Sequence, residues 1–178
     1  ACCGRPYSCF DQLSEHNCDF LMCYKSTSVP FTFDEQLFDW VEIGYDRLLP
    51  VRSPEMGPKR TSTLPGWNES PIAYLQYSRG SFLGAVTEQL FSSRPPNLTV
   101  KHVNAFAEAL KNLCLHGAGI AWLPEASIRR ELEDGRLQIA GGKEWWVDLK
   151  VVVYTEARLH QKNPSAAWQF FQEIAVSQ

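Results

Sequence analysis

The sequence lacks an excess of basic residues and a long apolar run. Its 178 residues include 17 Lys and Arg against 20 Asp and Glu, which gives a formal net charge of −3 at pH 7. Proteins that bind nucleic acid over a broad surface normally show a clear basic excess, so this chain alone is not expected to bind DNA. No apolar run approaches bilayer-spanning length, and the opening ACCGRPYSCF does not read as a secretion signal. We therefore expect a soluble protein.

Familiar catalytic patterns are also missing. There is no GxSxG elbow, and His16, His102, His116 and His160 are not spaced to form one metal-binding face. A GxG pair at residues 117–119 permits a phosphate loop, but such loops need further glycines or a lysine. The same glycines are explained by helix termination and close packing, so we expect no enzyme, no metal and no cofactor.

Six cysteines suit either of two redox settings. An even number fits disulfides in a small secreted protein, yet this chain is long enough to fold around an apolar core. Cys18, Cys23 and Cys114 lie in apolar runs, where a free thiol packs as a small hydrophobic group. These observations favour a reducing, cytoplasmic location.

Short strands alternate with helices of roughly ten residues along the chain, which is typical of an α/β fold with parallel sheets. Near the start, Ser8 is expected to cap a short helix. The apolar run 18–24 predicts a strand that is buried on both faces of a parallel sheet. Residues 33–51 predict two strands around Gly44, and the proline-rich residues 52–71 predict a loop.

The second half of the chain repeats this alternation. Ser81 is expected to cap a helix after a buried strand. A later helix is expected to bury an apolar face that includes Val103 and Phe106, and Gly117 or Gly119 should end it in a left-handed conformation. Further strands and helices are expected in ranges 120–123, 124–134, 137–139, 147–155 and 165–175.

Four collinear stretches carry a resemblance to a known family. NLCLHGAGIAWLP, followed by a helix that ends in EDGRL, resembles the glycine turn and Leu-Pro strand end in the effector-binding domain of LysR-type transcriptional regulators. LSEHNCDFLMCY looks like a helix and strand of that domain, and YLQYSRGSFLGAV is similar to its cleft strand and following helix. The cysteine-rich start and AGIAWLPEASIRRELEDG most resemble the hypochlorite-responsive branch of the family in enteric bacteria.

The resemblance implies two Rossmann-like lobes joined by two crossover strands, as in type 2 periplasmic binding proteins. Lobe I would comprise residues 1–45 plus 140–178, and lobe II residues 46–139. An effector would bind between the lobes, and the domain would form homodimers or homotetramers. DNA would be bound only through an N-terminal winged helix-turn-helix, which is absent from this sequence, as are the first strand and helix expected for lobe I. A periplasmic-type solute-binding protein is the alternative, and a signal peptide in the full-length gene would favour it.

One junction between a strand and a helix is the candidate effector site. Ligands bind open α/β sheets where strands end, and free N–H groups in the first turn of a helix favour an anion. The hydroxyls of Ser78 and Ser81 are expected to orient a small anionic effector, although a plain helix cap beside a solvated arginine is the simpler alternative. The candidate residues are Tyr77, Ser78, Arg79, Gly80 and Ser81.

Sulfur atoms are the candidate sensors of hypochlorite or another oxidant. Cys9 is expected at the first helical position after Ser8, where the helix dipole increases the reactive thiolate fraction; an inert cysteine is the alternative. Met56 is expected in an accessible loop and Met22 in a buried strand, where packing is its expected role. Oxidation makes methionine polar, and it would shift the population of lobe or dimer arrangements.

Overall fold

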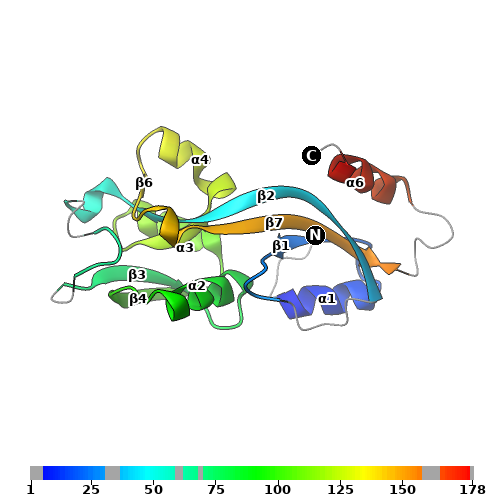
Figure 1. Cartoon of the computed structure of the whole chain (residues 1–178), viewed down its shortest axis with the longest axis horizontal. Helices are drawn as coiled ribbons and strands as arrows, with labels where there is room; N and C mark the ends of the chain where they lie inside the picture. The colour runs from blue at the N-terminus through cyan, green and yellow to red at the C-terminus, as the bar shows by residue number, and fades with distance from the viewer. Residues whose placement is uncertain (1–5, 31–36, 59–61, 68–69, 158–164, 177–178) are drawn as a thin grey trace. The chain divides into compact units, whose positions relative to one another are not determined.

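The chain forms two compact units in a computed structural model that describes residues 6–30, 37–58, 62–67, 70–157 and 165–176. Unit 1 comprises Ala1–Tyr45 with Leu149–Gln178, and unit 2 comprises Asp46–Asp148. Strands β2 (Phe38–Arg52) and β7 (Val147–Glu156) each run from one unit into the other (Figure 1). The chain therefore passes into unit 2 and returns through two crossover strands.

The return to unit 1 comes later than the expected boundary between residues 139 and 140. Residues 140–148 belong to unit 2 because hydrogen bonds join them to its other residues. The Trp122 Nε1–H donates to the Trp145 carbonyl at 2.9 Å, and the Ala140 N–H donates to the Pro50 carbonyl at 2.9 Å. Strand β7 (Val147–Glu156) is the strand that returns to unit 1.

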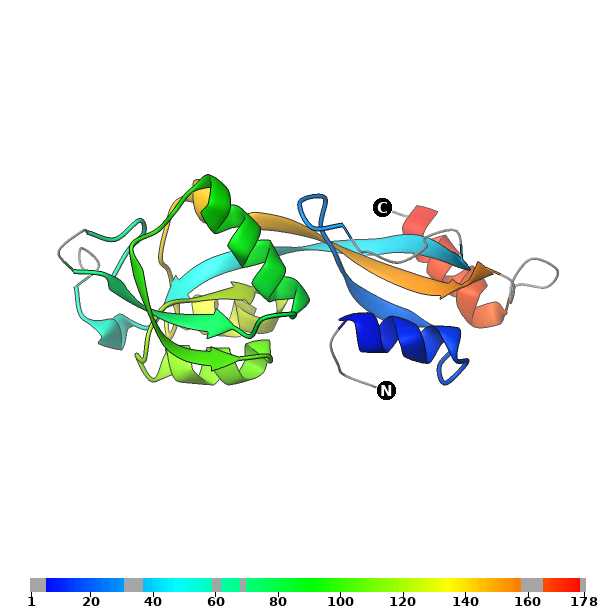
Figure 2. The ribbon, with the colours of Figure 1, turned by 90° about the horizontal axis from the view of Figure 1, so that it is seen from below.

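Unit 1 is an antiparallel arrangement with a helix on each side. Strand β7 lies between β2 and the antiparallel β1 (Leu21–Lys25). Helix α1 (Pro6–Ser14) lies on one side of these strands and α6 (Ala166–Val176) on the other (Figure 2). The α1 side encloses a core that comprises Phe10, Leu13, Phe38, Val152 and Tyr154, with Cys18, Leu21 and Cys23 packed against it.

Three expectations for unit 1 are wrong. Helix α1 begins at Pro6, so Ser8 lies inside it; proline suits the first helical position because its φ is fixed and it has no N–H to satisfy. Met22 is 58% exposed, because Leu21 and Cys23 pack against the core on one face of β1 and the side chain between them points to the opposite face. Residues 38–52 form one strand rather than two, and the glycines with positive φ do not include Gly44.

Unit 2 contains the parallel strands that the sequence predicted. Strand β3 (Ile72–Tyr77) pairs in parallel with β4 (Leu98–Asn104). A parallel bridge from Tyr74 to Ile120 brings β5 (Ala121–Pro124) to the other side of β3. Strand β5 and the short β6 (Gln138–Ile139) pair antiparallel with β2.

Helices cover both faces of this sheet. Helices α2 (Phe82–Ser93) and α3 (Ala107–Leu115) lie on opposite faces of the β3–β4 pair (Figure 1). Helix α4 (Glu125–Glu133) follows β5, and short 3-10 turns occupy η2 (Pro54–Met56) and η4 (Lys143–Trp145). No helix among the described residues combines the length and the apolar character that crossing a bilayer requires.

Local signals in unit 2 are largely confirmed. Ser81 caps α2, and Gly117 and Gly135 adopt positive φ values of 72° and 77° just after α3 and α4. Val103 and Phe106 are 58% and 55% exposed, so the expectation that they are buried is wrong. Helix α3 begins only at Ala107, and both side chains precede the buried part of its face.

Candidate functional site

The carboxyl ends of β3 and β4 meet at one edge of unit 2. Tyr77 pairs with Asn104 at the end of the ladder, and the Ser78 N–H donates to the Asn104 carbonyl at 2.9 Å. The predicted residues 77–81 form the single tight connection from β3 to α2, where Gly80 has a φ of 79°. Strand ends of this kind are where open α/β sheets bind ligands.

The Ser81 hydroxyl is already engaged in the structure of this connection. Its Oγ donates to the Ser78 carbonyl at 2.8 Å and accepts from the Gly84 N–H at 3.2 Å. A Cβ on Gly84 would lie 2.7 Å from the Ser81 Oγ, so the glycine makes room for the cap. Ser81 therefore shapes the helix start and does not offer its hydroxyl to a ligand.

The remaining predicted residues fall into two groups. The Tyr77 side chain is 2% exposed and packs in the core of unit 2, so it supports the junction through its packing. Ser78 is half-buried and Arg79 is exposed. Within the described residues, the structure records no hydrogen bond from the Ser78 hydroxyl and no ion pair for Arg79. These two side chains are the polar groups that a ligand at this edge could meet.

Asn104 is a residue of this edge that sequence reasoning missed. Its Oδ1 accepts the Phe106 N–H at 2.9 Å, and its backbone carbonyl accepts the Ser78 N–H. The signal that could have identified it is a polar residue directly after a strand that ends beside Tyr77. The Leu83 N–H, in the first turn of α2, also has no acceptor recorded among the described residues.

A second charged group lies at the carboxyl end of β5. Arg47 Nε and Nη2 donate to the two Glu125 carboxylate oxygens at 2.7 and 2.9 Å, and the guanidinium lies 5.0 Å from the centre of the Trp146 ring. The hydrogen bond to Glu125 raises the pKa of Arg47. Arg47 is therefore neutralised within the fold, whereas Arg79 is not paired with a described carboxylate.

The sulfur candidates lie in three different local environments. Cys9 is half-buried and is the fourth residue of α1 rather than the first, so the expected helix-start position is wrong. Met22 is exposed, and Met56 is half-buried at the end of η2. The accessibility expected of the two methionines is thus reversed. Burial raises the pKa of Cys114 to about 12, which matches its predicted role as a packed thiol.

Comparison with known proteins identifies relatives. The sequence matches the family described as the LysR substrate binding domain over residues 3–175. The HTH-type transcriptional regulator YjiE of Escherichia coli (strain K12) is 28% identical over 151 residues, which cover 81% of this chain and 48% of that protein. The chain thus spans about half the length of this relative.

Two solved structures show the same fold. The bromide-bound regulatory domain of HypT from Salmonella typhimurium has a TM-score of 0.76 at 25% identity, over 97% of this chain and 80% of that chain. Full-length HypT, a hypochlorite-specific LysR-type transcriptional regulator, has a TM-score of 0.74 at 27% identity, over 98% of this chain and 56% of that chain.

Proposed function

The chain belongs to the family of LysR substrate binding domains, a family of regulatory rather than catalytic domains, and on this premise we propose that it senses a small anion or hypochlorite for a transcriptional regulator. Its two α/β units joined by crossover strands agree with the periplasmic-binding-protein-like fold of that family. DNA binding would belong to a segment outside these residues.

The β3–α2 junction is the observation that carries this proposal. Ser78, Arg79 and the Leu83 N–H gather at the amino end of α2, where the helix dipole favours negative charge. The Ser81 cap and Gly84 hold the turn in place. A related regulatory domain has been solved with bromide bound, which supports a halide or a small carboxylate as the class of ligand.

Methionine oxidation would supply the response to oxidant. Met22 is the methionine that an oxidant in solution reaches most readily. Met56 ends η2, which packs on the turn after α3: a Cβ on Gly117 would lie 3.4 Å from the Glu55 Cβ. A sulfoxide on half-buried Met56 would place a polar oxygen in this contact. Oxidation of Met56 would therefore change the packing of unit 2. Oxidation of Met22 would only make the exposed surface of β1 more polar.

An apolar strip of unit 2 supports assembly of the domain with a second copy. Val100, Val103 and Phe106 are exposed on β4 and just after it, and β4 pairs only with β3 among the described strands. Exposed strand edges readily accept another chain. We propose that homodimers or homotetramers cover this strip.

Halide binding to an arginine variant tests the proposal. The thermal midpoint of the chain is measured by circular dichroism in sodium bromide and in sodium fluoride at equal ionic strength. We expect bromide to raise the midpoint and Arg79→Gln to abolish this effect. Arg129→Gln, which removes an exposed arginine of α4, should leave it intact. Equal bromide responses in the two variants would contradict the proposal.

A further inference from the structure

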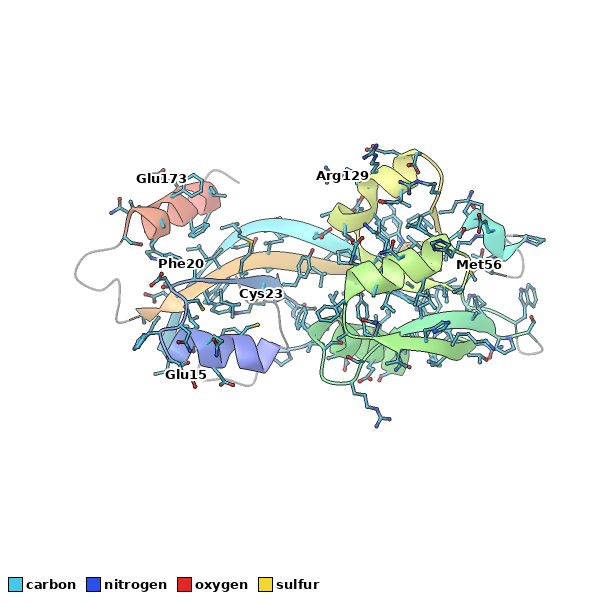
Figure 3. The ribbon with its side chains drawn as sticks, turned by 180° about the vertical axis from the view of Figure 1, so that it is seen from behind. Glu15, Phe20, Cys23, Met56, Arg129 and Glu173 are labelled. Carbon is cyan, nitrogen blue, oxygen red and sulfur yellow. The ribbon has the colours of Figure 1, made fainter. Side chains whose placement is uncertain are left out.

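Two cysteines lie on the two sides of the contact between α1 and β1. Cys9 is one helical turn before Leu13, and residues four apart share a helix face; Leu13 is buried in the core of unit 1. Cys23 lies opposite the buried Val152 in the β1–β7 register and packs against the same core. Figure 3 shows Cys23 on β1 next to α1.

The environment of Cys23 keeps its thiol protonated at neutral pH. Burial, and then negative charge on Cys9, raise the pKa of Cys23 to about 12. Both thiols are free in the structure. Among the described residues, no group of three metal-ligating side chains forms.

We propose that Cys9 and Cys23 form a reversible disulfide when the chain meets hypochlorous acid, which ties α1 to β1. The Cys9 thiolate attacks the chlorine of hypochlorous acid, forming a sulfenyl chloride and releasing hydroxide. The Cys23 sulfur then attacks the Cys9 sulfur, the S–Cl bond breaks and chloride leaves. The Cys23 proton converts the hydroxide to water, so two sulfurs are oxidised while chlorine is reduced to chloride.

The order of these steps follows from the two environments. Cys23 keeps its proton at neutral pH, and the thiolate is the nucleophilic form, so Cys23 acts second, as the partner that attacks the oxidised Cys9. Cys18 packs against the same core and is the competing partner. The reaction uses neither methionine nor the β3–α2 junction, so its failure would leave the proposed function standing.

Peptide mapping distinguishes these partners. Cys2→Ser and Cys3→Ser are introduced so that Cys9 is the one thiol in fragment 1–10 after cleavage before aspartate. The same cleavage separates Cys18, in fragment 11–18, from Cys23, in fragment 19–33. The reduced chain receives equimolar hypochlorous acid, is alkylated with N-ethylmaleimide, and is digested for mass spectrometry.

We expect fragment 1–10 to be linked to fragment 19–33 and to be released by dithiothreitol. Cys18→Ser should keep this link and Cys23→Ser should abolish it, with the buried Cys114 remaining unalkylated as a report that the variant is folded. A link to fragment 11–18, or full alkylation of Cys9 and Cys23 after the oxidant is consumed, would overturn the proposal. The Cys18→Ser result decides the question even if Cys23→Ser does not fold.

Discussion

The Asp46 carboxylate caps a helix from a distant part of the chain: its Oδ1 accepts the N–H of Ala126, 80 residues later, at 3.1 Å. Helix α4 has Pro124 at its N-cap, which provides no capping side chain. The same oxygen accepts the Arg47 N–H at 2.7 Å, and Arg47 holds Glu125 at the first turn. Strand β2 therefore fixes the start of α4 through two consecutive residues.

Removal of this cap should destabilise unit 2. We expect Asp46→Ala to lower the free energy of unfolding by about 1–2 kcal/mol, because a helix N–H loses its acceptor. Urea denaturation followed by circular dichroism measures the change. Asp39→Ala, which removes an exposed carboxylate from the same strand, should have little effect. Equal stabilities of the two variants would show that Asp46 does not cap α4.

The Ser81 cap makes a second stability prediction. Ser81→Ala should lower the free energy of unfolding by about 1 kcal/mol, whereas Ser81→Gly should cost only a few tenths. Ser92, whose exposed hydroxyl donates to the Glu88 carbonyl, provides the control variant Ser92→Ala. If the Ser81 and Ser92 alanine variants unfold at the same urea concentration, the cap contributes nothing to α2.

Close packing at Gly119 makes a third prediction. A Cβ there would lie 2.7 Å from the Ala73 carbonyl oxygen, so Gly119→Ala would force β5 away from β3. We expect a loss of about 2 kcal/mol, within the usual range for overpacking. Gly135→Ala has open space but a φ of 77°, and it should cost about 1 kcal/mol. The opposite ranking in urea denaturation would argue against close packing at Gly119.

The sequence predicted those features of the fold that depend only on residues close together in the chain. The Ser81 cap and the left-handed turn at Gly117 were foreseeable because each depends on residues within one helical turn. The exposure of Met22 depends on which face of β1 the core covers, and the continuity of β2 through Gly44 depends on which strands are its neighbours; an apolar run reveals neither. Ser8 fits the pattern of a helix cap, but Pro6 starts α1 two residues earlier because proline suits the first helical position.

The candidate site shows the same division. Its position at the β3–α2 junction followed from the strand-to-helix pattern and remains a prediction as a binding site. The engagement of Ser81 in the fold and the proximity of Asn104 required knowledge of the β3–β4 register. The capping of α4 by Asp46 links residues too distant in sequence for any local pattern to reveal.

An ion pair in unit 1 should make stability depend on pH. Lys150 Nζ donates to Glu42 Oε2 at 2.6 Å, and this bond holds the pKa of the Glu42 carboxyl below its ordinary value. A carboxyl with a lowered folded pKa stabilises the fold above its unfolded pKa, about 4.3, and this contribution is lost as pH falls through the folded value.

Glu42→Gln should therefore reduce the loss of stability between neutral pH and about pH 3, and 1 M salt should shrink the difference because the pair is only half-buried and solvent ions reach it. Urea denaturation at each pH measures this loss. Glu133→Gln, at an exposed position of α4, is the control. A steeper loss of stability in Glu42→Gln than in the parent chain would contradict the assignment.

Hypochlorite should oxidise the two methionines one after the other. Met22 is 58% exposed and Met56 is half-buried, so limited hypochlorite should produce sulfoxide at Met22 first. Peptide mass spectrometry over a time course measures both rates, and the near-ultraviolet circular dichroism spectrum should change only with the slower reaction. In Met22→Leu, the Met56 rate should be unchanged. Faster oxidation of Met56 would mean that η2 is more open than the structure shows.

Anion recognition at the start of α2 is tested most directly by titrating the ¹⁵N-labelled chain with bromide and recording backbone amide shifts by NMR. Binding at this junction predicts saturable shifts centred on Ser78, Arg79, Leu83 and Asn104, with fluoride at equal ionic strength causing none. Shifts that do not saturate, or that cluster on residues remote from the β3–α2 junction, would contradict it.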